Sequence, residues 1–287
     1  MKELLTLLLI PLACCMFSCI PIVIDHEDCD EDNPYTEYEQ EVLNFPASPY
    51  HSVAIETENG EIKSSTSDSD YIRVELNLWA TGETAAEAEA HIQDIEVIVD
   101  EDSISGRLSI WIRMPDHTNR GYGCAVTLIL PEDLFVDLKT YNGLIQARGH
   151  ESGINALSYN GKLTLEDTAG EANLITYNGR IMVDHHRGNI VGETLNGEIE
   201  ARVDMPDNYG ICTFTSSNGK IYLAVPDTVG AMITLRTANG TISVDPGLPT
   251  QPDSNPDDNI YESVMGNGSG TIYARSYNGD VTLAELH

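Results

Sequence analysis

One short phrase recurs through the second half of the chain. It consists of a hydroxyl residue, one variable residue, Asn-Gly, a second variable residue and a branched aliphatic residue. The first four copies are 18 residues apart, and the later steps are 22, 21 and 39 residues. A turn signal at a period near 20 residues is typical of a repeat protein. The repeated pairs are Asn142-Gly143, Asn160-Gly161, Asn178-Gly179, Asn196-Gly197, Asn218-Gly219, Asn239-Gly240 and Asn278-Gly279.

Each copy predicts the same local structure. Asn-Gly favours the positive φ angles of a tight turn, so we expect a structural turn at every copy. Alternating apolar residues such as Ile181 and Val183 follow the turn, which is typical of a half-buried strand. A second small-residue turn, such as Arg187-Gly188, precedes another alternating run. We therefore predict an all-β chain that forms a parallel β-solenoid, with two short strands in each rung of 18–22 residues.

The solenoid is expected over residues 138–287, with a Pro/Asp-rich insertion at 245–270 and a shorter one at 204–210. Residues 45–137 are predicted to form a small α+β cap at its N-terminal end. This cap contains a divergent copy of the phrase at Asn59-Gly60 and several strand-like runs. Thr84 and Glu87 form a capping-box pattern that predicts a short helix ending near Asp94.

The N-terminus is predicted to be a targeting segment. The apolar stretch from Leu4 to Phe17 is too short to span a bilayer. It ends at Phe17-Ser18-Cys19, which resembles a bacterial lipobox, so residues 1–18 are predicted to be a lipoprotein signal peptide. Cys19 is the expected lipidation site; Cys14 is a rival, and a simple secretory signal is a further alternative. Residues 19–44 are rich in acids and are expected to be a disordered tether. The expected location is the bacterial cell envelope, at the outer membrane or the cell surface, with the membrane as partner through the lipid.

The formal net charge of −31 excludes whole classes of partner. A nucleic-acid binder needs a basic patch, and a protein that lies flat on an anionic membrane needs one as well. High negative charge favours solubility first. We expect no cofactor, although the acids between Asp245 and Glu262 offer oxygen ligands for weak calcium binding. The alternative for this insertion is an extended, solvated strap.

The order of motifs resembles a known family. An early Asn-Gly phrase, an Ala/Glu-rich helix and a strand pair precede L-P-E-D-L-F-V-D-L-K-T-Y-N-G-L-I (residues 130–145) and the later Asn-Gly copies. This order is similar to the bacterial putative-adhesin family of domains of unknown function, related to the head GIN and auto-transporter-adhesin-like domains. The resemblance covers residues 45–245 and 268–287. It implies a β-solenoid in a secreted or lipid-anchored protein, and it brings no catalytic residues.

Three groups of residues are candidate sites. Tyr141, Tyr159 and Tyr177 occupy the same place in successive copies, so their rings form either a platform for glycan contact or a mutually stacked edge. Asp184-His185-His186, with Glu166, Asp167 and His150, combines residue types that can bind zinc, but the spacing matches no standard motif, so we expect solvated turn residues and no metal site. Cys212 falls in a buried aliphatic column, and a disulfide to Cys124 is an open alternative.

No enzyme motif is present in the sequence. The residue after each Asn-Gly varies in type, which argues against a catalytic strip along the repeats. We therefore expect a non-enzymatic envelope protein that contacts a surface glycan or protein. The alternative is a carbohydrate-binding or carbohydrate-active solenoid. The varied positions are Leu144, Lys162, Arg180, Glu198, Lys220, Thr241 and Asp280.

Overall fold

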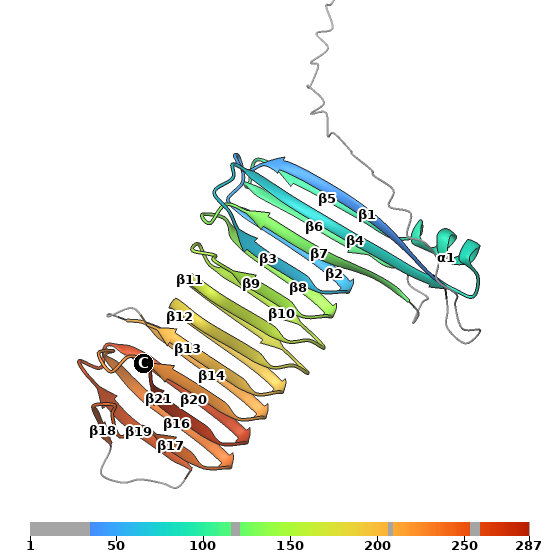
Figure 1. Ribbon diagram of the computed structural model, residues 1–287. Helices are drawn as coiled ribbons and strands as arrows, with labels where there is room; N and C mark the ends of the chain where they lie inside the picture. Colours follow the sequence, from blue (N-terminus) through green and yellow to red (C-terminus); the bar gives the residue numbers. More distant parts are fainter. Residues whose placement is uncertain (1–34, 116–120, 206–208, 253–258, 287) are drawn as a thin grey trace, which may run out of the picture.

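The computed structural model describes residues 35–115, 121–205, 209–252 and 259–286 (Figure 1). These residues form strands and one helix, so the prediction of a nearly all-β chain is confirmed. The N-terminal part contains β1 (Tyr35–Pro46), β2 (Ser52–Asn59), β3 (Ile62–Thr66), β4 (Tyr71–Gly82), α1 (Ala85–Ile92), β5 (Glu96–Asp102), β6 (Arg107–Arg113) and β7 (Tyr122–Leu130). None of the helices in the described ranges is long and apolar enough to cross a membrane.

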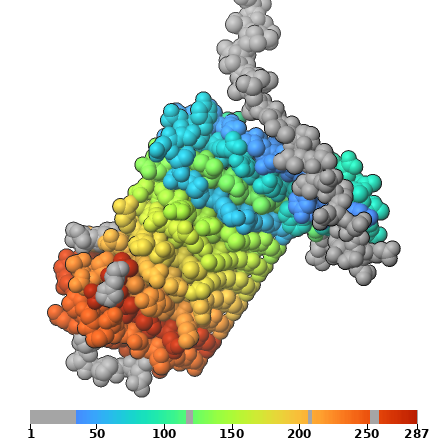
Figure 2. Space-filling model, viewed as in Figure 1, coloured from blue at the N-terminus to red at the C-terminus, as the bar shows by residue number. Residues whose placement is uncertain are grey.

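The segments that carry the Asn-Gly phrase are called repeats below. Their strands follow one another along the molecule and appear as successive bands of colour in Figure 2. They are β8 (Phe135–Asn142), β9 (Ile145–Arg148), β10 (Ile154–Ser158), β11 (Leu163–Thr176), β12 (Ile181–Asn196), β13 (Ile199–Asp204), β14 (Ile211–Asn218), β15 (Ile221–Val225), β16 (Ala231–Asn239), β17 (Ile242–Val244), β18 (Thr250–Pro252), β19 (Ile260–Met265), β20 (Gly270–Asn278) and β21 (Val281–Glu285).

The repeats pair through two ladders of parallel strands. The first ladder runs β6-β2-β8-β10-β11-β12-β14-β20-β16. The second ladder runs β7-β3-β9-β11-β12-β13-β15-β21-β17. The long strands β11 and β12 contribute their first halves to the second ladder and their second halves to the first. Antiparallel strands flank both ladders, as β5 does beside β6 and β19 beside β16.

The register places identical positions of the phrase on top of one another. Thr57 pairs with Thr140 and Asn59 with Asn142, so the divergent copy at Asn59-Gly60 is the first member of the series. Between the ladders, the aliphatic residues that follow the Asn-Gly pairs are buried, including Ile145, Leu163 and Ile181, and only Ile242 is half-buried. Each strand thus buries its apolar side chains against the same positions of its neighbours, as the alternating pattern predicts.

The last repeat does not follow the sequence order. The order of the sequence would place Tyr277 beyond the repeat that carries the insertion. Instead β20 pairs with β14 on one side and with β16 on the other, so the last repeat lies between the fifth and sixth copies (Figure 1). The chain passes through β16 and β17, turns back through the antiparallel strands β18 and β19, and then inserts β20 and β21.

The expected tether is wrong for residues 35–44. These residues belong to β1, which pairs antiparallel with β4 along its whole length. Leu43 and Phe45 are buried and fix the C-terminal part of this strand to the core, whereas the acids Glu37 and Glu39 lie nearer its start. The acid count alone concealed these apolar residues. Residues 19–34 lie outside the described residues, as do Cys14, Cys19 and the segment 1–18.

The predicted helix is confirmed in α1. Thr84 is its N-cap, and the Thr84 hydroxyl accepts a hydrogen bond from the Glu87 backbone N–H at 3.2 Å. The Glu87 carboxylate in turn accepts from the backbone N–H of Glu83 at 2.9 Å. Ala88 and Ile92 are the buried residues of this helix, which contacts β4 and β1.

The glycines of the phrase have a different role from the expected one. Positive φ was predicted at each Asn-Gly turn, yet of these seven glycines only Gly279 has φ in that range, at +157°. The others are required because the backbones of successive repeats touch. A Cβ atom on Gly179 would overlap the carbonyl group of Gly161, and the same overlap recurs at Gly143, Gly161, Gly197, Gly219 and Gly240.

Candidate functional site: an aromatic row and a groove on the first ladder

Two rows of hydrogen bonds fix the corner at which the first ladder ends. Each Asn side chain donates from Nδ2 to Oδ1 of its neighbour, as Asn178 does to Asn160 at 2.9 Å. The row is continuous from Asn59 to Asn239 and runs through Asn278 before Asn239. Each hydroxyl donates to the glycine carbonyl of the adjacent repeat, as Thr176 does to Gly161 at 3.0 Å. Thr57 begins the series, and its buried hydroxyl has no partner among the described residues.

The residue before each Asn points outward beside this corner. In three consecutive repeats it is a tyrosine, and these residues, Tyr141, Tyr159 and Tyr177, form the aromatic row. Tyr141 and Tyr159 stack with ring centroids 4.0 Å apart and an interplanar angle of 13°, and Tyr159 and Tyr177 stack at 4.9 Å and 5°. The rings of Tyr141 and Tyr177 are about half exposed. The structure therefore brings the three predicted tyrosines together, and mutual stacking leaves their outer surfaces accessible. In the next repeat the same position is Leu195, which is also exposed.

A groove of about 450 Å³ continues the aromatic row. Its floor is β14, whose outward side chains are small hydroxyl residues, including Thr215 and Ser217. One wall is β20, which pairs in register with β14 and carries the larger Tyr273, Arg275 and Tyr277 on the same face. The groove exists because the last repeat lies beside β14. If the repeats followed the order of the sequence, β16 would lie beside β14. Thr234, Arg236 and Ala238 would then replace Tyr273, Arg275 and Tyr277 in the wall of the groove.

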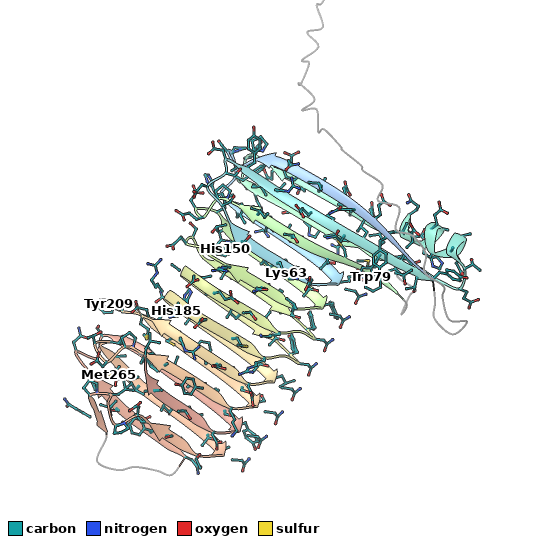
Figure 3. The ribbon with its side chains drawn as sticks, viewed as in Figure 1. Lys63, Trp79, His150, His185, Tyr209 and Met265 are labelled. Atoms are coloured by element: carbon teal, nitrogen blue, oxygen red, sulfur yellow. The ribbon has the colours of Figure 1, made fainter. Side chains whose placement is uncertain are left out.

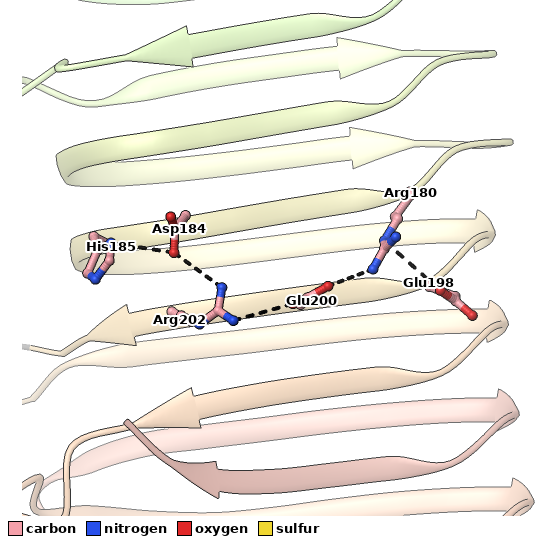
Figure 4. Close-up of polar contacts among 6 residues, drawn as sticks. All are labelled: Arg180, Asp184, His185, Glu198, Glu200 and Arg202. Carbon is pink, nitrogen blue, oxygen red and sulfur yellow. Dashed lines mark hydrogen bonds and ion pairs between the residues drawn. The ribbon is translucent and has the colours of Figure 1, made fainter. Parts of the chain in front are cut away.

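The outer face of the second ladder carries a charged network that the sequence reasoning missed. Arg202 lies 3.2 Å from Asp184 and 3.6 Å from Glu200, and Arg180 bridges Glu200 at 2.6 Å and Glu198 at 4.0 Å (Figure 4). The residue after each Asn-Gly varies, but another outward column does collect charged residues, because Arg148, Glu166, Asp184 and Arg202 recur every 18 residues. This spacing was the available signal. The paired charges are partly exposed, and such pairs contribute little stability each.

The histidines occupy two kinds of environment. His150 and His186 are fully buried, so the expectation of solvated turn residues is wrong for both, whereas His185 is exposed and lies 3.4 Å from Asp184 (Figure 3). His150 Nε2 lies 2.9 Å from the Ser64 hydroxyl. His186 donates from Nε2 to the Asn189 carbonyl at 3.2 Å, and its Nδ1 lies 3.0 Å from the Thr168 hydroxyl. Within the described ranges, no group of three or more His, Cys, Asp or Glu side chains is arranged to hold a metal ion.

Burial sets the pKa values of these internal groups. It lowers the pKa of His150 to about 4 and also lowers that of His186, because the charged imidazolium loses its hydration. It raises the pKa of the Cys124 thiol to about 12 and raises that of Cys212. Both thiols are free, so no disulfide joins them. Cys212 occupies the column of Ile190 as predicted.

The acidic insertion is only partly described. Asp253, Asn255, Asp257 and Asp258 lie outside the described residues. Of the remaining acids, Glu262 forms an ion pair with Arg236 at 3.4 Å, and Asp245 accepts from the backbone N–H of Gly247 at 2.9 Å. Calcium binding by this segment stays a prediction.

Comparison with known proteins gives a weak likeness. No protein-family model and no curated protein matches the sequence. The structure is similar to a putative cell adhesion protein from Clostridium sporogenes, with a TM-score of 0.35 and 10% identity over 88% of this chain and 100% of that chain. For a putative adhesin from Bacteroides fragilis, the TM-score is 0.43 with 10% identity over 85% and 97% of the two chains. For a putative lipid binding protein from Parabacteroides distasonis, it is 0.29 with 13% identity over 86% and 97%. At these scores the likeness assigns neither a family nor a ligand.

Proposed function

We propose that this chain is a non-enzymatic protein of the bacterial cell envelope, anchored by a lipid at Cys19, that contacts a surface glycan or protein. The two parallel ladders are the faces of a β-solenoid that serves as a rigid scaffold. The observation that carries this proposal is the exposed aromatic row beside a fixed corner. Tyr141, Tyr159 and Tyr177 present their rings from a framework of stacked Asn and hydroxyl hydrogen bonds.

The chemistry of the row supports binding over catalysis. Its rings provide apolar edges, because the stack covers the faces between neighbours, and the adjacent Asn side chains hydrogen-bond to one another. The groove is lined by hydroxyls, one amide, two phenols and one guanidinium, with no carboxylate to act as general acid or base. A glycosidase-type mechanism uses a pair of carboxylates at the bond that is cleaved. The charged network of the second ladder supplies acids, but each of them is ion-paired with Arg180 or Arg202 (Figure 4).

A glycan array read for both binding and turnover tests this proposal. We expect the purified protein to bind a subset of glycans and to release no reducing ends from them. Tyr159→Ala should weaken this binding, because Tyr159 is the ring that stacks on both neighbours. Tyr38→Ala is the matched control, since Tyr38 is an exposed tyrosine on β1. Release of reducing ends from a bound glycan would favour the carbohydrate-active alternative.

A further inference from the structure

Arg275 differs from every other arginine in the described part of the chain. The sequence has 46 acids against 15 bases, so a guanidinium group has many potential partners. Each of the other eight arginines in the described ranges lies within ion-pair distance of an Asp or Glu. Arg275 forms no such pair with any described residue, although its side chain is exposed on β20. This charge is therefore available to a ligand.

The neighbours of Arg275 leave its charge uncompensated. On one side it pairs in register with Arg236, whose guanidinium group is already bound to Glu262 at 3.4 Å. On the other side it pairs with Thr215, which is neutral. The closest acid in the same row is Glu193, one strand beyond Thr215 and so roughly 9–10 Å away along the ladder. Two adjacent guanidinium groups repel each other, and an anion in the groove would relieve that repulsion.

The remaining lining of the groove selects the kind of anion. Tyr273 and Tyr277 lie two residues before and after Arg275, so all three side chains leave the same face of β20. Opposite them, Thr215 and Ser217 offer hydroxyl groups. A guanidinium group binds a carboxylate through two parallel hydrogen bonds. Phenol rings provide apolar area with a polar tip, and hydroxyl rows match the hydroxyls of a sugar.

We infer that the groove binds a carboxylate-bearing sugar residue, such as a uronate unit of an acidic polysaccharide. Arg275 receives the carboxylate, the rings of Tyr273 and Tyr277 flank the sugar, and the hydroxyls of β14 bind its polar edge. This inference rests on the proposed function and names the ligand class of its binding surface. It also explains how a chain with a net charge of −31 can bind an acidic glycan, because the interaction is confined to one local cationic group.

Calorimetry with tetragalacturonate, and with its methyl ester as the uncharged twin, tests the inference from the ligand side. We expect the acid to bind and the ester to bind at least roughly tenfold more weakly, since a hydrogen-bonded charge is lost. On the protein side, Arg275→Gln should weaken binding of the acid by a similar factor and leave binding of the ester unchanged. Lys162→Gln is the matched control, because Lys162 is the other described cation without a carboxylate partner and lies outside the groove. It removes the same charge and should preserve binding.

The outcomes separate this inference from the proposed function. Equal affinity for acid and ester, or an Arg275→Gln protein that binds the acid as wild type does, would overturn the carboxylate site. The site would also be overturned if inorganic sulfate competed as strongly as the sugar acid. The groove would then bind any anion, with no contribution from the sugar ring. If the protein bound only neutral glycans on the array, the proposed function would be supported and the carboxylate site would be refuted. Failure to bind any glycan or cell surface would refute the proposed function itself.

Discussion

At the scale of single residues, each position of the recurring phrase has its own physical task. The hydroxyl side chain satisfies the glycine carbonyl of the adjacent repeat, and the Asn side chain extends the amide row. The Gly allows the backbones of successive repeats to touch, because it has no Cβ atom. The aliphatic residue fills the core, and the two variable residues, before the Asn and after the Gly, lie on the surface and are free to differ. This division explains why the phrase is strict at four positions and variable at two.

Replacing Gly179 tests the role of close approach. We expect Gly179→Ala to lower the free energy of unfolding by about 1–3 kcal/mol, the usual cost of overpacking, because the added Cβ overlaps the Gly161 carbonyl. Gly179→Asn should be at least as destabilising, although Asn tolerates positive φ. Urea denaturation gives both values, with the exposed Leu195→Ala as control. Full stability of the Asn variant would show that φ, and not contact, selects glycine here.

The buried histidines predict acid sensitivity. An unfolded His has a pKa near 6.5, and the folded pKa of His150 is about 4. Above pH 6.5 both states are neutral and the group has no effect. Between pH 6.5 and 4 the unfolded chain binds a proton that the folded chain does not, so stability falls as the pH falls. His186 acts in the same direction because its pKa is also lowered. The full effect of His150 is about 3 kcal/mol.

Urea unfolding at pH 7.0 and 4.5 measures this effect. In His150→Gln the side chain does not titrate, so we expect a smaller loss of stability between the two pH values than in wild type. The comparison uses the difference between the pH values, which cancels any constant cost of the substitution. His185→Gln is the control, because His185 is exposed. An unchanged pH dependence in His150→Gln would contradict the assignment.

At the scale of strands and repeats, the sequence predicted the structure wherever contacts are local or join equivalent positions of consecutive repeats. The 18-residue spacing predicts that Asn142, Asn160 and Asn178 stack, and their side chains do hydrogen-bond to one another. The capping box at Thr84 predicts α1 for an equally local reason. Strand β1 was not predicted, because its acids outnumber its two buried apolar residues, Leu43 and Phe45. Their burial depends on pairing with β4, which is distant in the sequence.

The candidate site was only half predictable. The aromatic row follows from the repeat spacing of Tyr141, Tyr159 and Tyr177. The groove does not, because it depends on β20 lying between β14 and β16. Two orders of the last repeats bury the same aliphatic columns, so hydrophobic patterning cannot distinguish them. The order became apparent only from the pairing of the strands.

Disulfide trapping tests the order of the repeats. Residues paired in register on adjacent parallel strands lie within the Cα separation that a disulfide needs, whereas residues two strands apart do not. We therefore expect Thr215→Cys with Arg275→Cys to cross-link under mild oxidation, and Thr215→Cys with Arg236→Cys to remain reduced. The native thiols of Cys124 and Cys212 are buried and should not interfere. Mass spectrometry of unreduced peptides identifies the bond, and the opposite result would restore the sequence order.

At the scale of the whole molecule, the acidic charge protects the exposed edges of the sheet. Strand β1 pairs with β4 on one side only in the described structure, and a long edge strand invites pairing with other chains. Its sequence places Glu37, Glu39 and Glu41 along that edge, where two copies would bring like charges together. Partial burial raises the pKa of Glu41, and repulsion from the nearby Glu39 carboxylate raises it further. Pairing of two copies through this edge would therefore be opposed by charge repulsion.

The proposed anchor gives the last prediction. If Cys19 carries the lipid, Cys19→Ala expressed in a bacterial host with lipoprotein processing should lose lipid labelling and move to the soluble fraction. The apolar stretch before it is too short to hold the protein in the bilayer alone, because a spanning helix needs roughly 20 residues. Cys14→Ala is the control and should remain lipidated and membrane-bound. Loss of the label in Cys14→Ala instead would assign the anchor to Cys14, and retention of the label in both variants would refute the lipoprotein assignment at either cysteine. The folded part is expected to be unchanged in each variant, since its first described strand begins at Tyr35.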